Sequence, residues 1–475
     1  MSGRRPLGQA LFYALSVALS RGLAIVMVPF VTTHLSTAEY GSIELMQSLA
    51  DVASVVLGFG LVDALYRFIG DARDEADRRR IGAAAFGLVL LLGAVAAMGL
   101  QAAAGLFQAL LGPAVDPLAL RLLLGSVAID GAIQVPLAWL RMTDRASFYL
   151  TMIGLRSLLQ AGLMVAALEA NLGVPGAMAA GLAAAVLTAL ILAVQQARST
   201  GVRFDMHTIG TLLRYGSPLV LAGLGGFVLG SFDRLLLAPA VPVAALAEYA
   251  IAAKVALIAP LLFQPFSLWW FPRRIIILSE PDGRERSAQT VTFGLAYLTW
   301  IGLGVALGGP VLVTVMTPPA YHGAIRYVPW LVLAGFVQHA ADLLNVGSFL
   351  GRGTSRPTAI NLAAAGVALA AYLLLIPKLG VMGAVIATVV AYAARLVLFV
   401  LDNRRLAPLS LPWARLGLYA ILAALAVWAI PSGLGWLSGG LVLAAGSAIA
   451  GAVALALGLA PVPSRFRPHL FRRVV

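Results

Sequence analysis

Leu172-Gly173-Val174-x-Gly176-Ala177 recurs 207 residues later as Leu379-Gly380-Val381-x-Gly383-Ala384. Two other phrases also occur twice, in the same order and at nearly the same spacing. They are Ala38-Glu39-Tyr40, which returns as Ala247-Glu248-Tyr249 after 209 residues, and Arg141-x-Thr143-x-Arg145, which returns as Arg352-x-Thr354-x-Arg356 after 211 residues. Because three repeated phrases share almost one offset, the sequence predicts a duplicated structural unit.

The composition predicts a membrane protein. Hydrophobic residues make up 61% of the 475 residues and charged residues only 11%, and the mean hydropathy is +0.93. A soluble chain could not bury so much apolar surface, so lipid must be its main solvent. Arg4 and Arg5 precede an apolar run of spanning length, which predicts a retained signal-anchor helix. The chain has no cysteine, which excludes disulfides, thiol catalysis and cysteine-ligated metal sites.

Apolar runs of about 20 residues, bounded by charge, glycine or proline, predict an all-α integral membrane protein with fourteen transmembrane helices. The predicted segments lie near 8–31, 41–69, 81–110, 118–140, 147–168, 174–194, 211–237, 245–271, 289–316, 327–350, 357–376, 380–401, 413–431 and 436–460.

The placement of positive charge predicts the orientation. If the N-terminus is cytoplasmic, the cytoplasmic segments carry 22 arginines, whereas the opposite loops hold only Arg326 and Lys378, with Arg121 at a helix edge. This bias in short loops predicts that both termini are cytoplasmic. The net charge of +13 therefore reflects topology. It does not indicate nucleic-acid binding, because no basic face interleaved with aromatic residues is present.

The repeated phrases divide the chain into two similar halves. Each half would hold six helices, an even number, so the halves would run parallel about an axis along the membrane normal, an arrangement found in transporters. The predicted parts are an N-terminal six-helix lobe at 1–194, a cytoplasmic linker at 195–210, a C-terminal six-helix lobe at 211–401, and two further helices with a basic tail at 402–475.

Several helix-end motifs resemble those of a known transporter family. They are Val28–Leu35 followed by Glu39-Tyr40-Gly41, Leu213–Leu219, Phe232–Leu237 and Leu375–Ala384. With these motifs the chain resembles the oligosaccharide flippases of the polysaccharide transport (Wzx-like) family, in the superfamily shared with MATE multidrug exporters and lipid II flippases. The resemblance implies a V-shaped pair of six-helix lobes with a central cavity that opens alternately to each side.

The same resemblance implies a cargo and a place in the cell. The cargo would be a polyprenyl-diphosphate-linked oligosaccharide, such as an O-antigen (lipopolysaccharide), capsule or exopolysaccharide repeat unit, moved to the outer leaflet of a bacterial inner membrane. The alternatives are a lipid II flippase and a MATE-like ion-coupled exporter of small molecules. Membrane lipids are the other expected partners. Association with the glycan polymerase machinery and the oligomeric state stay open.

Charged residues inside the predicted helices are the candidates for cargo binding. Arg21, Arg156 and Lys254 lie well inside predicted spans, where each charge costs roughly 2.5–3.5 kcal/mol on insertion scales. Arginine can hold phosphate through two parallel hydrogen bonds, and lysine can hold it as a point charge. Three such cations therefore favour an anionic diphosphate over the cationic drugs that MATE exporters carry. The alternative is that they pair with buried acids.

The buried acids and the repeated arginines have two interpretations each. Asp51, Asp130 and Asp342 could form a proton or sodium site or only hydrogen bonds between helices, and interhelical polar contacts are the commoner use. Asp51 belongs to a polar helix at 41–69 that is expected to line the cavity. The repeated arginines could contact anionic headgroups, brace the lobes or act only as topology determinants. These are Arg141, Arg145, Arg352 and Arg356.

An enzyme is not expected. The sequence has no glycine-rich phosphate loop, no cluster of metal-ligating side chains and no nucleophile elbow, so neither a metal nor a cofactor is expected. A transporter without a nucleotide site would draw its energy from an ion gradient, the membrane potential or the consumption of cargo on the far side.

Overall fold

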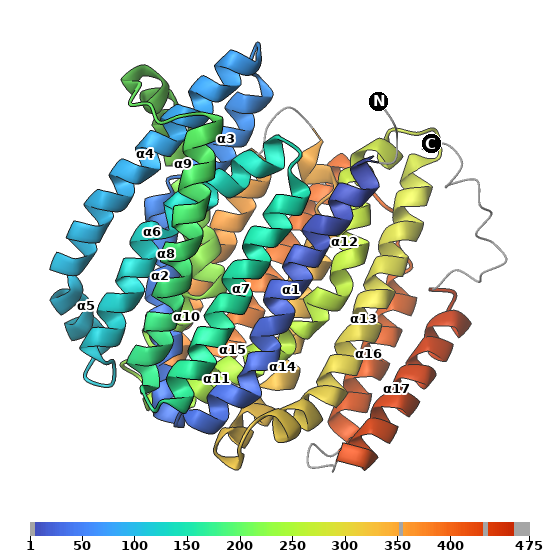
Figure 1. Ribbon diagram of the computed structural model, residues 1–475. Helices are drawn as coiled ribbons and strands as arrows, with labels where there is room; N and C mark the ends of the chain where they lie inside the picture. Colours follow the sequence, from blue (N-terminus) through green and yellow to red (C-terminus); the bar gives the residue numbers. More distant parts are fainter. Residues whose placement is uncertain (1–4, 351–354, 431–435, 460–475) are drawn as a thin grey trace. The chain divides into compact units, whose positions relative to one another are not determined.

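The computed structural model describes residues 5–350, 355–430 and 436–459. All the regular structure in these ranges is helical, and the chain divides into two compact units, Met1–Leu246 and Ala247–Val475. Figure 1 colours the helices in chain order. The predicted all-α membrane fold is confirmed.

Unit 1 is a bundle of long helices with three shorter ones. Its elements are α1 (Arg5–His34), α2 (Thr37–Gly58), α3 (Leu61–Gly70), α4 (Glu75–Ala102), α5 (Ala104–Leu111), α6 (Pro117–Met142), α7 (Ala146–Glu169), α8 (Gly173–Ser199), α9 (Met206–Gly230), α10 (Phe232–Leu237) and the first turn of α11 (Val243–Ala256). Within this unit α6 packs between α4 and α8, and α7 packs against both α1 and α8 (Figure 1).

Unit 2 holds the remaining helices. They are the rest of α11, α12 (Ile258–Leu278), α13 (Gly283–Met316), the 3₁₀ helix η1 (Pro319–Arg326), α14 (Val328–Leu343), the 3₁₀ turn η2 (Gly347–Phe349), α15 (Ser355–Leu406), α16 (Trp413–Ala429) and α17 (Trp436–Ala456). Helix α13 is central to the packing of this unit, because α12, α14, α16 and α17 all pack against it.

The predicted segments coincide with these helices, although length and composition alone select 11 membrane-spanning candidates within the described residues. Helix α15 has 52 residues and would be roughly 78 Å long at 1.5 Å per residue. It bends at Gly380, between the two segments predicted at 357–376 and 380–401. The helices α14 and α16, with 16 and 17 residues, are shorter than the other spans.

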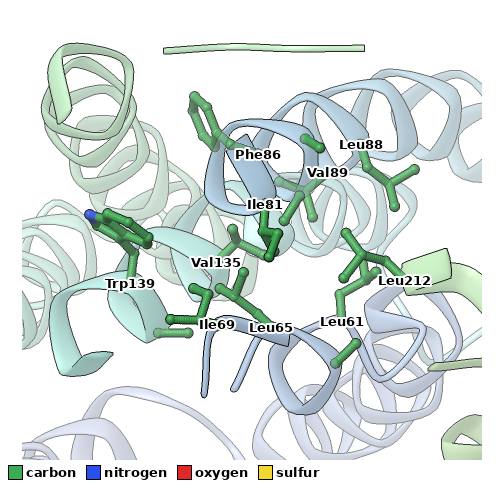
Figure 2. Packing of buried hydrophobic residues seen from close by; sticks show 14 of the residues in the cluster. Leu61, Leu65, Ile69, Ile81, Phe86, Leu88, Val89, Val135, Trp139 and Leu212 are labelled. Carbon is green, nitrogen blue, oxygen red and sulfur yellow. The ribbon is translucent and has the colours of Figure 1, made fainter. Parts of the chain in front are cut away.

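One apolar core of unit 1 joins four helices. Leu61, Leu65 and Ile69 of α3 pack with residues of α4, with Val135 and Trp139 of α6, and with Leu212 of α9 (Figure 2). All the members of this cluster are at most 7% exposed. The short helix α3 thus packs against three other helices. These contacts fix its position after the non-helical turn that separates it from α2.

Large apolar side chains also cover the outside of the bundle. Trp428 is 87% exposed, Leu441 71% and Met98 68%. Water would penalise so extensive an apolar surface, whereas lipid chains do not. The exposed surface therefore agrees with a multi-pass membrane protein.

Candidate substrate- and ion-binding site

Helices α1 and α7 run parallel and in register within unit 1. Near their starts the rings of Tyr13 and Tyr149 meet edge to face, with centroids 5.2 Å apart. At their ends Nε2 of His34 lies 3.5 Å from Oε1 of Glu169. The first pair is 136 residues apart in sequence and the second 135, so residues about 135 apart lie at the same height on the two helices.

This register places two predicted cargo-binding arginines at one height, because Arg21 and Arg156 are also 135 residues apart. Arg21 is exposed within the span Leu15–His34, and no hydrogen bond or ion pair joins it to another described residue. In contrast, Nη1 of Arg156 lies 3.6 Å from Oδ1 of Asp130 on α6, and the two side chains are 29% and 27% exposed. Arg156 therefore pairs with a half-buried acid, whereas Arg21 has no partner among the described residues.

The polar face of α2 meets the junction between α9 and α10. Oε2 of Glu44 lies 3.9 Å from Nε of Arg234, and both side chains are largely buried. The carboxylate of Asp51 accepts hydrogen bonds from Oγ of Ser231 at 3.0 Å and from Nε2 of Gln47 at 3.2 Å. Asp51 thus has two neutral donors and, within the described part of the chain, no ion pair. Sequence analysis identified this polar face but not Arg234 as its partner.

Two glycines explain why α2 breaks where it does. Phe59 and Gly60 adopt φ of 44° and 59° between α2 and α3, and at Gly216 of α9 an added Cβ would stand 2.0 Å from the carbonyl oxygen of Phe59. Only glycine permits so close an approach of two backbones. The motif Leu213–Leu219 therefore has a structural role, because Gly216 lets α9 pack directly against the backbone between α2 and α3.

In unit 2, Asp342 of α14 pairs with an arginine that sequence analysis did not single out. Nη2 of Arg395 on α15 donates to Oδ1 of Asp342 at 2.7 Å. The same guanidinium donates to Oδ1 of Asn361 at 2.7 Å and to the carbonyl of Gln338 at 3.2 Å. Arg395 is only 12% exposed. The criterion that selected Arg21, an arginine inside a predicted span, would also have found it.

Two further cations of unit 2 lie in α11 and α12. Lys254, the third predicted cargo contact, is half-buried on α11. The segment predicted at 245–271 ends before Arg274, but α12 extends to Leu278, and Arg274 is only 8% exposed. Its guanidinium donates to the side chain of Asn345 and lies 4.3 Å from the ring centre of Phe349. It is therefore part of the packing of this unit.

The first Arg-x-Thr-x-Arg copy ties three helices together. Arg141 donates to the hydroxyl of Tyr66 on α3 at 3.2 Å and to the hydroxyl of Tyr149 on α7. Arg145 directly precedes α7 and is exposed. In the second copy Arg352 lies outside the described residues, and Nη1 of Arg356 lies 3.9 Å from Oδ1 of Asp402. Arg141 thus braces helices within unit 1, whereas the Arg145 side chain has no hydrogen-bond or ion-pair partner in the described part of the chain.

The glycine that follows the leucine in the repeated phrase has nearly the same positive φ in both copies. Gly173 begins α8 with φ of 53°, and Gly380 bends α15 with φ of 54°. Since L-residues avoid this region, the match supports duplication. The Ala-Glu-Tyr copies have diverged, because Glu39 forms a capping box with Ser36, whereas Glu248 pairs with Arg326 at 3.0 Å.

A family model described as polysaccharide biosynthesis protein matches residues 7–274, more than half of the chain. The chain belongs to this family. No curated protein sequence matches it significantly. Among solved structures it is similar to the lipid II flippase MurJ in an inward closed conformation, with a TM-score of 0.72 and 10% identity over 94% of this chain and 99% of that one. It is also similar to an inward-facing MATE transporter of the MOP superfamily, with a TM-score of 0.60 and 17% identity over 84% of this chain and 98% of that one.

Membership of the polysaccharide biosynthesis family agrees with the motifs that predicted it. The match includes Val28–Leu35, Leu213–Leu219 and Phe232–Leu237. Gly216 of the second motif packs against Phe59, and Arg234 of the third lies beside Glu44 of α2. At identities of 10% and 17%, the structural likenesses show a shared fold and leave the cargo to be argued from this chain. In the described residues no group of three or more His, Asp or Glu side chains could hold a metal.

Proposed function

We propose that this protein flips a polyprenyl-diphosphate-linked oligosaccharide from the cytoplasmic to the outer leaflet of a bacterial inner membrane by alternating access. The family assignment supports a membrane transporter acting in polysaccharide biosynthesis. The observation that carries the choice of cargo is Arg21, a cation within a membrane span that no described residue neutralises. An anionic group that must cross the same zone would supply the missing partner.

The depth of Arg21 supports this assignment. It lies about 9 Å along the helix from Leu15 and about 20 Å from His34, at 1.5 Å per residue. A lone arginine at such depth is unfavourable in lipid and indicates contact with water or an anionic ligand. Arg156 lies at the same height and is held by Asp130 at 3.6 Å, longer than the usual charge-assisted hydrogen bond of about 2.7–2.9 Å. A diphosphate could therefore contact Arg21 directly and compete with Asp130 for Arg156.

The half-buried acids suit ion coupling. Asp51 is held by neutral donors only, so protonation or sodium binding there would not have to break an ion pair. We therefore assign coupling to Asp51 before Asp130 or Asp342, which both face arginines. Lys254 is retained as a second cargo contact.

The test is complementation of a deletion strain, with mass analysis of the polyprenyl-diphosphate sugars that accumulate. We expect Arg21→Gln to abolish export at a normal protein level, Arg21→Lys to retain part of it, and Arg121→Gln, at a helix edge, to behave like the wild type. Full export by Arg21→Gln would overturn the proposed cargo contact. Accumulation of lipid II instead would indicate the peptidoglycan precursor as cargo, and resistance to cationic drugs without lipid accumulation would indicate a MATE-like exporter.

A further inference from the structure

An open groove of about 680 Å³ lies between α7 and α8 in unit 1. It is here called the arginine groove and is defined by Arg145, Phe148, Leu190, Val194, Gln195 and Arg198. Positions 190, 194, 195 and 198 recur at helical spacing, so they form one face of α8. Its lining contains two arginines and no acid.

The polar groups of the groove lack partners in the protein. Arg145 and Arg198 are exposed, and neither guanidinium makes a hydrogen bond or ion pair with any described residue. Both side-chain amide atoms of Gln195 are shielded from solvent, yet neither has a hydrogen-bond partner in the described part of the chain. A buried amide without partners is costly, and two neighbouring cations repel each other. The repulsion between the two arginines would be relieved by one anionic ligand bound in the groove.

The apolar part of the groove indicates what else that ligand carries. Leu190 is 59% exposed and Val194 51%. Both lie on the same face of α8 as Arg198, with Val194 one turn and Leu190 two turns closer to the middle of the membrane span. A free ion would leave this apolar strip unused, whereas a lipid would cover it with an acyl chain. Arg198 lies in the last turn of α8, at the end predicted to be cytoplasmic, where anionic lipids concentrate.

We propose that the arginine groove binds one anionic phospholipid of the cytoplasmic leaflet. Arg145 and Arg198 hold the phosphate, since guanidinium groups bind phosphate oxygens in pairs of hydrogen bonds. One acyl chain lies along Leu190 and Val194. This site is independent of the proposed cargo, because it is built entirely from α7, α8 and the residue that precedes α7.

The test measures lipid binding to the purified full-length protein by native mass spectrometry, with dioleoyl phosphatidylglycerol and dioleoyl phosphatidylcholine as probes. We expect one saturable phosphatidylglycerol site at least tenfold tighter than any phosphatidylcholine site. The double variant Arg145→Gln/Arg198→Gln should lose this preference. The matched control Arg73→Gln/Arg78→Gln removes the same charge from exposed positions outside the groove and should keep it.

A second variant separates loss of the site from loss of the fold. Val194→Trp keeps both arginines but fills the apolar strip, and it should weaken phosphatidylglycerol binding at least fivefold with an unchanged melting temperature. The proposal is overturned if Arg145→Gln/Arg198→Gln binds phosphatidylglycerol within twofold of the wild type, or if the control loses as much. Displacement of the lipid by 1 mM inorganic phosphate would show an ion site instead, and tighter binding of undecaprenyl diphosphate would show a cargo site.

Discussion

Removal of Arg395 should destabilise the protein more than removal of any exposed arginine. Its guanidinium donates to Asp342, Asn361 and the carbonyl of Gln338 at 2.7–3.2 Å and is only 12% exposed. Breaking a fully buried ion pair costs about 3–5 kcal/mol, because the remaining charge is left uncompensated. Asp342 is 27% exposed and can be partly hydrated, so we expect Arg395→Gln to cost about 2–3 kcal/mol, since interactions between membrane helices are weaker than this limit.

The assay is reversible unfolding in mixed micelles of mild detergent and dodecyl sulfate, followed by circular dichroism. A double-mutant cycle with Asp342→Asn should give a coupling energy of about 1–1.5 kcal/mol. The matched control is Arg67→Gln, which breaks the exposed pair Arg67–Asp71 with side chains 60% and 56% exposed and should cost under about 0.5 kcal/mol. The reasoning is refuted if Arg395→Gln costs no more than Arg67→Gln.

Three further changes test other parts of the structure. Gly216→Ala should lower the melting temperature and the expression level, since its Cβ would stand 2.0 Å from the carbonyl oxygen of Phe59; a normal melting curve would contradict that contact. Asp51→Asn should uncouple export from the ion gradient in a vesicle assay with and without ionophore, and unchanged ionophore sensitivity would remove Asp51 from coupling. Hydrogen bonds, first of all from the Thr208 hydroxyl, lower the pKa of the Asp205 carboxyl that caps α9. This stabilisation is present above the ordinary value of 3.8 and is lost as pH falls through the folded pKa, so Asp205→Ala should flatten the acid limb of the stability curve.

The helices could be predicted from the sequence because lipid imposes a simple rule. Every backbone polar group in the membrane must be bonded within its own helix, so apolar length and flanking charge locate the segments. The prediction failed in detail where a helix continues past a charge. Arg274 was assigned to a loop, yet it lies inside α12, since Asn345 and Phe349 accommodate its guanidinium. No local pattern reveals such a distant partner.

The sequence also could not show which arginine pairs with each aspartate, because these partners come from different helices. The sequence identified Asp130 and Asp342 as acids inside predicted helices, and the structure gives each an arginine. It could not show that Asp130 pairs with an arginine of the next helix, Arg156 of α7. Nor could it show that Asp342 pairs with Arg395, in the second half of α15. Helix order within a bundle is set by packing between segments far apart in the chain, and a single sequence does not record it.

The two ion pairs, Asp342–Arg395 and Asp130–Arg156, differ in how easily an anionic cargo could displace the carboxylate. Nη2 of Arg395 lies 2.7 Å from Oδ1 of Asp342, and the guanidinium donates to two further acceptors. This arginine is therefore held in one position. Asp130 and Arg156 are 3.6 Å apart and both more than a quarter exposed, so an incoming anion can exchange for the carboxylate at lower cost. Arg21 stands at the same height as Arg156 and has no partner among the described residues. We therefore expect cargo recognition to be far more sensitive to substitution of Arg21 or Arg156 than to substitution of Arg395.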